Sequence, residues 1–134
     1  MTETVYAPPD VVAGLVGFLR KRGVNARTRV PLDRAPGLVR VTRTGGGPIN
    51  PSQDDAQLLI EVWEADQAAC FDLARTIWGM LALVSRDDQD AFPGLICYEA
   101  VPSVPIQYPD PDAPRLDRHQ LTVRMICRLE QITI

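Results

Sequence analysis

One set of alternating positions between His119 and Glu130 is entirely apolar. These inward positions are Leu121, Val123, Met125, Cys127 and Leu129, and the positions between them are Thr122, Arg124, Ile126, Arg128 and Glu130. Successive side chains of a strand point to opposite faces, so the pattern predicts a long strand with one buried face and one open face. The apolar face of such a strand must be covered, which favours a layer of helices packed on a sheet.

Two segments show the spacing of amphipathic helices. The first covers residues 11–22, with Asp10 at its start and Gly23 just after its end. The second begins after Asp66 as N-cap and reaches about Ser85. Its inner stripe is expected to be Cys70, Leu73, Ala74, Ile77, Leu81 and Val84. We expect both helices to cover the same face of the sheet.

Shorter alternating or β-branched segments predict the remaining strands. They are residues 24–30, 38–43, 57–64 and 95–101. The first two flank a turn at 31–37, so we expect a basic hairpin, and 57–64 is apolar on both faces, so we expect it to be central. The chain is therefore predicted to form a single α+β domain over residues 1–134, in the order α-β-β-β-α-β-β. Its two helices would pack on one face of a mainly antiparallel five-stranded sheet.

Two segments rich in glycine or proline connect these elements. Residues 44–54 read TGGGPINPSQD and predict a flexible loop. Residues 102–117 contain Pro102, Pro105, Pro109, Pro111 and Pro114. Proline has no N–H to donate to a sheet, so this second segment is expected to be an extended arm outside any sheet interior.

Charge is unevenly distributed along the chain. The segment from Arg20 to Arg43 holds eight basic residues and one acid, Asp33, which gives +7. The whole chain carries −3, so the remainder sums to −10. An acidic total argues against a protein whose main task is to bind nucleic acid, because such domains are usually basic.

Membrane insertion and secretion are not expected. The longest uncharged apolar stretch, residues 76–85, is about half of the ~20 residues that a spanning helix needs. The first ten residues lack the cationic and apolar blocks of a signal peptide, so we expect synthesis inside the cell. Three widely spaced cysteines fit reduced core residues better than a disulfide framework or a metal knuckle.

The sequence contains no recognisable catalytic motif. His119 is the one histidine, and its pairing with Cys97 as base and nucleophile is conceivable, but Cys97 has the pattern of a buried strand residue. The acids Asp87, Asp88 and Asp90 lack a histidine partner and the glycine of a calcium loop. We therefore expect no enzyme activity, no cofactor and no metal ligands.

The uncovered face of the sheet is the candidate interaction surface. The residues expected there are Arg27, Arg29, Trp63, Arg124, Ile126 and Arg128. Arginine mixed with large apolar side chains is typical of a partner surface. A solvated face with scattered apolar residues is the alternative interpretation, and the pattern leaves both open.

Three segments resemble a known family. They are Leu38 to Gly46 (LVRVTRTGG), Leu58 to Ala65 (LLIEVWEA) leading into the alanine-rich helix 68–83, and Tyr108-Pro109-Asp110-Pro111 followed by Pro114-Arg115 and the strand from Gln120 to Arg128. Together they look like the tail terminator proteins of bacteriophages with long non-contractile tails. The resemblance covers nearly the whole chain but includes no catalytic signature.

The resemblance implies a structural virion protein, assembled in the cytoplasm of the host bacterium. Such subunits usually form a hexameric ring on the last ring of the tail tube, which ends tube polymerisation and offers a surface to the head. The implied partners are further copies of the chain, the tail tube protein and the head-tail connector, and DNA only passes through the lumen. No membrane is implied.

A ring needs two different patches of one subunit to meet, and the +7 and −10 regions are candidates for such a pair. We expect Trp63, Ile126 and Tyr108 to be apolar anchors, with Arg40 and Arg43 directed toward a neighbour or the channel. Two alternatives remain open. One is a head-tail connector of the phage neck, and the other is a small cytoplasmic protein that binds nucleic acid through residues 20–43.

Overall fold

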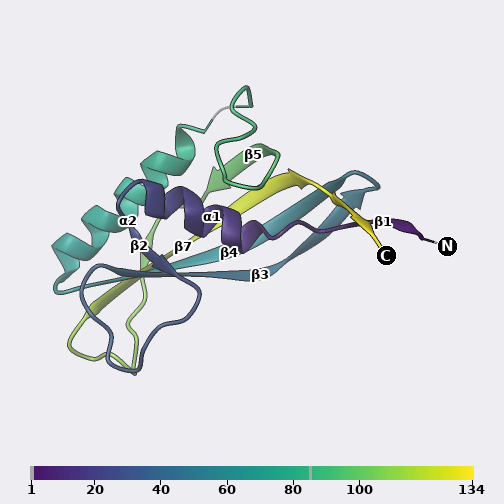
Figure 1. Cartoon of the computed structure of the whole chain (residues 1–134). Helices are drawn as coiled ribbons and strands as arrows, with labels where there is room; N and C mark the ends of the chain where they lie inside the picture. Colours follow the sequence, from purple (N-terminus) through teal and green to yellow (C-terminus); the bar gives the residue numbers. More distant parts are fainter. Residues whose placement is uncertain (1, 85) are drawn as a thin grey trace.

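The computed structural model describes residues 2–84 and 86–134 (Figure 1). It has an α+β fold with two helices, a mixed sheet of six strands and a separate sheet of two strands. In chain order the elements are β1 (Thr4–Ala7), α1 (Val11–Lys21), β2 (Asn25–Arg27), β3 (Leu38–Asn50), β4 (Gln53–Glu64), α2 (Gln67–Ala82), β5 (Cys97–Pro102), β6 (Ile106–Gln107), β7 (Asp117–Arg128) and β8 (Glu130–Thr133). Neither described helix is long and apolar enough to span a bilayer.

The expected α+β class with two helices is confirmed, but the sheet differs from the expected five-stranded one. Its main path runs β2-β3-β4-β7-β5, and β6 pairs with β7 on the same side as β5. β2 runs parallel to β3, and the other pairs are antiparallel. β4 is central, as its two apolar faces predicted.

Both helices begin as their caps predict. The Asp10 carboxylate accepts a hydrogen bond from the Ala13 amide at 3.0 Å, and Asp66 accepts one from the Ala69 amide at 2.8 Å. Gly23 follows α1 with φ +82°, a conformation that favours glycine at a helix end. α2 ends at Ala82, and the expected end at Ser85 lies outside the described residues.

The main core lies between the sheet and the helices, which cover one face (Figure 1). Even-numbered β4 residues face this core, and the loop between α2 and β5 closes it because Phe92 packs on Phe18 with ring centroids 4.6 Å apart. The buried apolar members from β4, α2 and β7 are Ala56, Leu58, Ile60, Val62, Cys70, Ala74, Ile77, Leu81, Leu121, Val123, Met125 and Cys127. Of the expected α2 stripe, Leu73 and Val84 are only partly buried.

The prediction of a flexible loop at 44–54 is wrong. β3 continues through the three glycines to Asn50, and β4 begins at Gln53, so the segment forms most of a long hairpin. The ladder shifts register between Arg43 and Gly45. Gly46 has φ +82°, and a Cβ there would lie 2.0 Å from the Asp55 carbonyl oxygen. The glycines therefore do not form a mobile loop. They allow the two strands to approach closely where the ladder is irregular.

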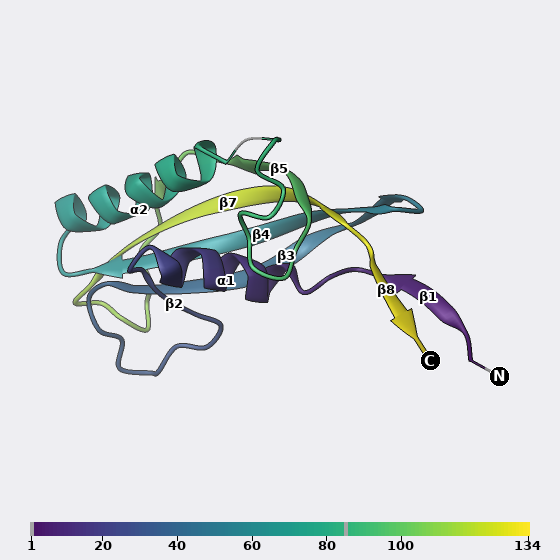
Figure 2. The same cartoon turned by 45° about the horizontal axis from the view of Figure 1, so that its top comes forward.

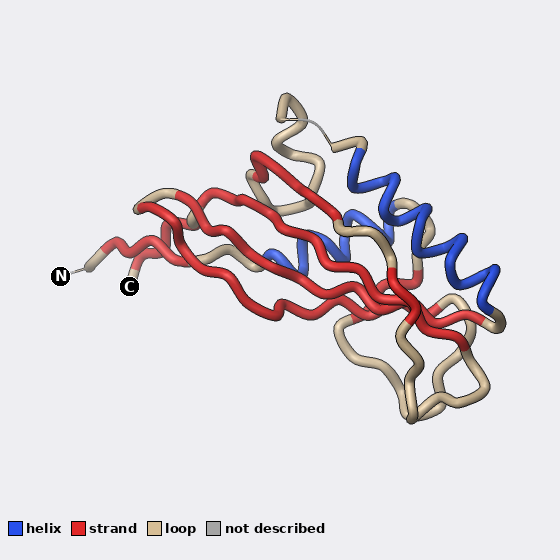
Figure 3. Tube along the Cα trace, turned by 180° about the vertical axis from the view of Figure 1, so that it is seen from behind, coloured by secondary structure: helices blue, strands red, loops and turns tan. Residues whose placement is uncertain are grey.

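The predicted basic hairpin of 24–30 and 38–43 is also wrong. β2 is only three residues long and pairs with β3 in parallel, with Ala26 opposite Val39. The chain between them, residues 28–37, crosses one end of the sheet before entering β3 (Figure 3). A parallel pair cannot be closed by a tight turn, which explains the length of this crossing.

The proline-rich segment 102–117 is not a free arm. Pro102 ends β5, Ile106 and Gln107 pair with β7, and the rest folds back over the same end of the sheet as residues 28–37. The prolines still keep this segment out of the sheet interior, as expected, because β5 and β6 are short strands at the sheet edge.

The sequence pattern did not predict the small second sheet. β7 ends at Arg128, and Glu130–Thr133 instead pairs antiparallel with Thr4–Ala7. Glu3 and Ile134 exchange backbone hydrogen bonds of 3.0 and 2.8 Å at its end. Figure 2 shows this two-stranded ribbon extending beyond the main sheet, with both chain ends at its tip.

We expect Gly46→Ala to lower the free energy of unfolding by about 1–3 kcal/mol, because alanine must adopt a left-handed conformation against the Asp55 carbonyl. Gly47→Ala is the matched control, since a Cβ there meets no atom of the described residues within 4 Å, and we expect a change within about 0.5 kcal/mol. Urea unfolding of both variants measures the difference. Equal stability of the two variants would contradict this account of the hairpin.

Candidate functional site

The face of the sheet opposite the helices carries the candidate functional surface. Odd-numbered β4 residues point to it, with partners on β3 and β7 set by the antiparallel register. One end of this face is closed by residues 28–37 and 108–116, and the other end is open (Figure 3). The closed end is organised by two buried carboxylates, Glu61 and Asp110.

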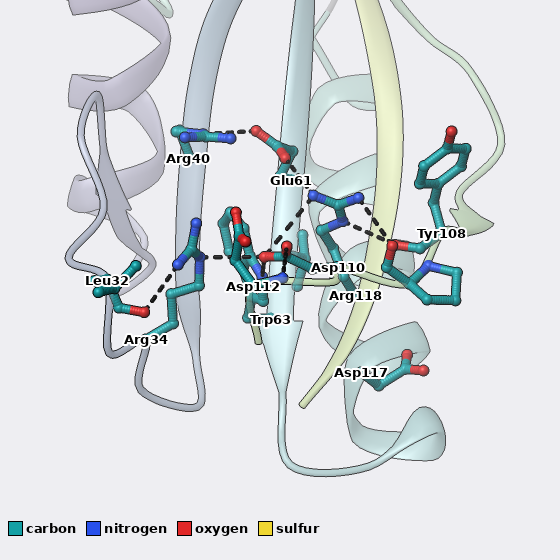
Figure 4. Close-up of polar contacts among 12 residues, drawn as sticks. Leu32, Arg34, Arg40, Glu61, Trp63, Tyr108, Asp110, Asp112, Asp117 and Arg118 are labelled. Atoms are coloured by element: carbon teal, nitrogen blue, oxygen red, sulfur yellow. Dashed lines mark hydrogen bonds and ion pairs between the residues drawn. The ribbon is translucent and has the colours of Figure 1, made fainter. Parts of the chain in front are cut away.

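Glu61 lies in the middle of the sheet between two arginines. Its Oε1 accepts a hydrogen bond from Arg40 Nε at 2.6 Å, and its Oε2 accepts one from an Arg118 guanidinium nitrogen at 3.0 Å (Figure 4). The hydrogen bond with Glu61 outweighs the effect of burial and raises the pKa of Arg40. A buried carboxylate needs such compensation, so Glu61 fixes the position of both arginines.

Asp110 joins the two crossing loops to the sheet. Its Oδ2 accepts a hydrogen bond from Trp63 Nε1 at 2.9 Å and lies 3.2 Å from Arg34 Nε and 3.9 Å from Arg118 (Figure 4). Its Oδ1 accepts a hydrogen bond from the Asp112 amide at 2.9 Å. Burial acts to raise the pKa of Asp110, but these hydrogen bonds and the two guanidinium charges together lower it.

Trp63 is not an exposed anchor, which corrects the expectation from sequence. Its side chain is fully buried in a second small core with Leu38 and Ala113, and the guanidinium groups of Arg34 and Arg40 lie over its ring at 5.4 and 5.6 Å. The alternation placed Trp63 on the open face correctly, but the two loops cover it there. Within the subunit, its side chain packs against those loops.

Arg43 does not lead a loop toward a neighbour either. It makes two hydrogen bonds to the buried Asp54 carboxylate, at 2.7 and 2.9 Å, within the β3–β4 hairpin. These bonds outweigh burial and raise its pKa. Arg34, Arg40 and Arg43 of the basic segment are thus paired with acids of this same chain, which reduces the charge that the segment offers to a partner.

The other predicted arginines lie at the surface. Arg124 makes a two-pronged contact with Asp55 across β4 and β7, with both bonds 2.8 Å, and this lowers the pKa of Asp55. Arg27 on β2, Arg29 in the following loop and Arg128 at the end of β7 are exposed. Within the described part of the chain, none of these three forms an ion pair.

An apolar groove of about 230 Å³ lies where β6 meets β7. Its lining residues are Leu59, Ser103, Val104, Ile106, Tyr108, Gln120, Leu121 and Thr122. Val104, Ile106 and Tyr108 are each more than half exposed, and Arg118 lies 5.4 Å from the Tyr108 ring centroid. Tyr108 therefore remains a candidate contact residue, together with two apolar neighbours that the sequence analysis did not select. Ile126, on the same face, is half-buried.

The cysteines and the histidine form contacts that sequence spacing did not indicate. Cys97 faces Cys127 across β5 and β7, whereas His119 lies near Cys70 and Asp117 under α2. Cys70 is fully buried and donates a hydrogen bond to the Val62 carbonyl at 3.2 Å. Burial, reinforced by the Asp117 carboxylate, raises the pKa of the Cys70 thiol to about 12. A buried, protonated thiol is a poor nucleophile.

Some of these features left a signal in the sequence. Glu61 is the one charged residue in the apolar run 58–63, and a charge in such a position indicates a buried partner of opposite sign. The identity of its partners depends on strand register, which one sequence does not give. The groove and the Cys70, Asp117 and His119 cluster combine residues far apart in the chain and had no local signal.

No family model matches this chain, and no curated protein matches its sequence. The family resemblance therefore rests on the residues quoted above.

We expect Asp110→Asn to destabilise the protein at neutral pH by about 1–3 kcal/mol, because it weakens bonds to Trp63 and two arginines. The folded-state pKa of Asp110 is lowered, so its contribution is present above the unfolded pKa of about 3.9 and is lost as pH falls below that value. The stability gap between wild type and Asp110→Asn should therefore be largest near pH 7 and shrink below about pH 4.

Urea unfolding at pH 7 and at pH 3 measures this gap, with Asp88→Asn in the exposed acidic loop as control. A gap that stays constant over this range would show that the Asp110 charge does not contribute as described.

Proposed function

We propose that this chain is a structural protein of a bacteriophage tail, which assembles into a ring, with six copies as the expected number, and ends the tail tube. The proposal combines the family resemblance with the distribution of exposed apolar residues. The implied partners are further copies of the chain, the tail tube protein and the head-tail connector.

The single observation that carries the proposal is the presence of two separate apolar patches at opposite ends of β7. The groove lies beside the first residues of β7, where Ile106 pairs with Gln120. The ribbon of β1 and β8 follows the last residues of β7 and exposes Tyr6, Ile132 and Ile134. A two-stranded ribbon alone is marginally stable, so this one gains from a partner surface.

Two different patches on one subunit supply a head-to-tail contact. Repeated contacts of that kind close into a ring when the rotation between subunits permits it. The subunit has 7749 Å² of accessible surface, and two contacts of about 800 Å² would use about a fifth of it. Most of the surface would remain for the tube and the head side.

The charge contribution to assembly is smaller than the +7 segment implied. Arg34, Arg40 and Arg43 already pair within the subunit. Among the described residues, the basic residues of that segment that form no ion pair are Arg20, Lys21, Arg22, Arg27 and Arg29. Exposed ion pairs contribute about 0–1 kcal/mol each, so they would set orientation while apolar contacts supply affinity. The same internal pairing weakens the nucleic-acid alternative, because it removes three arginines from the available patch.

We expect the purified chain to form a species near six times 14.8 kDa in sedimentation velocity experiments over a wide concentration range. Ile106→Gln should raise the concentration needed for assembly about tenfold or more, because it places a polar group in the lining of the apolar groove. Leu83→Gln is the control, since Leu83 is even more exposed than Ile106 but lies at the end of α2. Equal effects of the two substitutions would contradict this interface assignment.

The function itself is tested with the tail tube protein encoded in the same genome. Added during tube growth, the wild-type chain should give shorter tubes with one capped end, visible by electron microscopy, and Ile106→Gln should restore long tubes. Unchanged tube length at saturating protein would contradict a terminator. Binding to the head side without any effect on length would support the connector alternative.

A further inference from the structure

Three side chains capable of metal ligation meet beneath the N-terminal part of α2. They are Cys70, Asp117 and His119, and one ligand atom from each lies within 4.8 Å of the others. Asp117 and His119 are two residues apart on β7, so their side chains leave the same face of the strand, and Cys70 approaches from the helix above. Cys70 and His119 are buried, and the Asp117 side chain is 13% exposed.

Two atoms of this cluster have an unusual contact. His119 Nδ1 lies 2.8 Å from Asp117 Oδ2, yet the pair lacks hydrogen-bond geometry, and among the described residues neither buried atom has another hydrogen-bond partner. Buried polar atoms without partners are rare in proteins, and each needs an explanation. A metal ion bound to both atoms would satisfy both lone pairs, after the two atoms separate from 2.8 Å to the roughly 3.3 Å between tetrahedral zinc ligands.

We propose that Cys70, Asp117 and His119 form a zinc site that fastens α2 to the start of β7. Sulfur, imidazole nitrogen and carboxylate oxygen are all zinc ligands, with bond lengths of about 2.3, 2.0 and 2.1 Å. Tetrahedral zinc with these bond lengths places its ligand atoms about 3.3–3.6 Å apart, so side-chain shifts of about 1–1.5 Å bring the three atoms into range, with a water as the fourth ligand. On binding, zinc replaces the thiol proton of Cys70, which passes to solvent.

The surroundings of the cluster suit a metal site. Gln107 Nε2 donates a hydrogen bond to Asp117 Oδ1 at 2.6 Å, which leaves Oδ2 directed to the cluster. Outer contacts of this kind orient ligating carboxylates. Phe71 packs beside His119 with ring centroids 5.8 Å apart, and Phe71 is itself partly exposed, so only a thin cover separates the cluster from solvent.

The site is independent of the proposed assembly, but the two are adjacent. Gln107 belongs to β6, whose other residue, Ile106, lines the groove. Zinc would therefore hold β6 as well as α2, and it would stabilise the folded chain by an amount that grows with the logarithm of the zinc concentration above the dissociation constant.

The test is a titration of the reduced, full-length chain with cobalt(II), which occupies zinc sites and absorbs in the near ultraviolet when bound to thiolate. We expect one cobalt per chain with a thiolate charge-transfer band, and displacement of that band by zinc. Cys70→Ser should abolish the band, and Cys127→Ser should retain it, since Cys127 is buried away from the cluster. Near-ultraviolet circular dichroism confirms that each variant is folded.

Two further variants keep the proposal testable if Cys70→Ser does not fold. His119→Gln should weaken zinc binding more than tenfold, and Gln107→Ala should weaken it about tenfold because it releases Asp117. Absence of the band in folded wild-type protein, or its persistence in folded Cys70→Ser, would overturn the proposal. Zinc affinity unchanged in His119→Gln would also overturn it.

Discussion

The buried carboxylate of Glu61 is the constraint on which the open face of this sheet depends. A charge in the middle of a central strand must be compensated, and Arg40 and Arg118 do so from the two neighbouring strands. Arg118 in turn donates hydrogen bonds to the carbonyls of Tyr108 and Pro109, which positions the proline-rich segment. That segment then brings Asp110 to Trp63 and Arg34. Glu61 is thus connected through Arg118 and Asp110 to the two loops that close one end of the sheet.

The same arrangement decides which surfaces remain for partners. Trp63 and three arginines of the basic segment are used within the subunit, so they supply stability and shape. The exposed apolar residues include those of a groove at one end of β7 and of a projecting ribbon at the other. This separation of patches is the physical basis for proposing head-to-tail assembly, and it moves the expected contacts from charged to apolar residues.

In the zinc proposal, the first part of α2 and the start of β7 together supply the three ligands of one metal site. Cys70, Asp117 and His119 lie in a region where the helix packs on the strand, and β6 is attached to it through Gln107. A metal there would stabilise the edge of the sheet that carries the groove, without being part of the groove. Stability and assembly can therefore be tested separately in this chain.

The sequence by itself determined the local elements and the faces they bury. The helices begin at the caps Asp10 and Asp66, and the alternation in 57–64 and in most of 119–130 assigned the core face correctly, because both signals act over a few residues. Leu129, expected to point inward, lies past the end of β7 and is only partly buried. Only the tertiary structure decided the partners: the parallel pairing of β2, the hairpin through Gly46, the cover over Trp63 and the ribbon of β1 with β8. These features depend on strand register and on contacts between residues far apart in the chain. Local periodicity carries no information about either, so the open face was identified in advance while its usable residues were not.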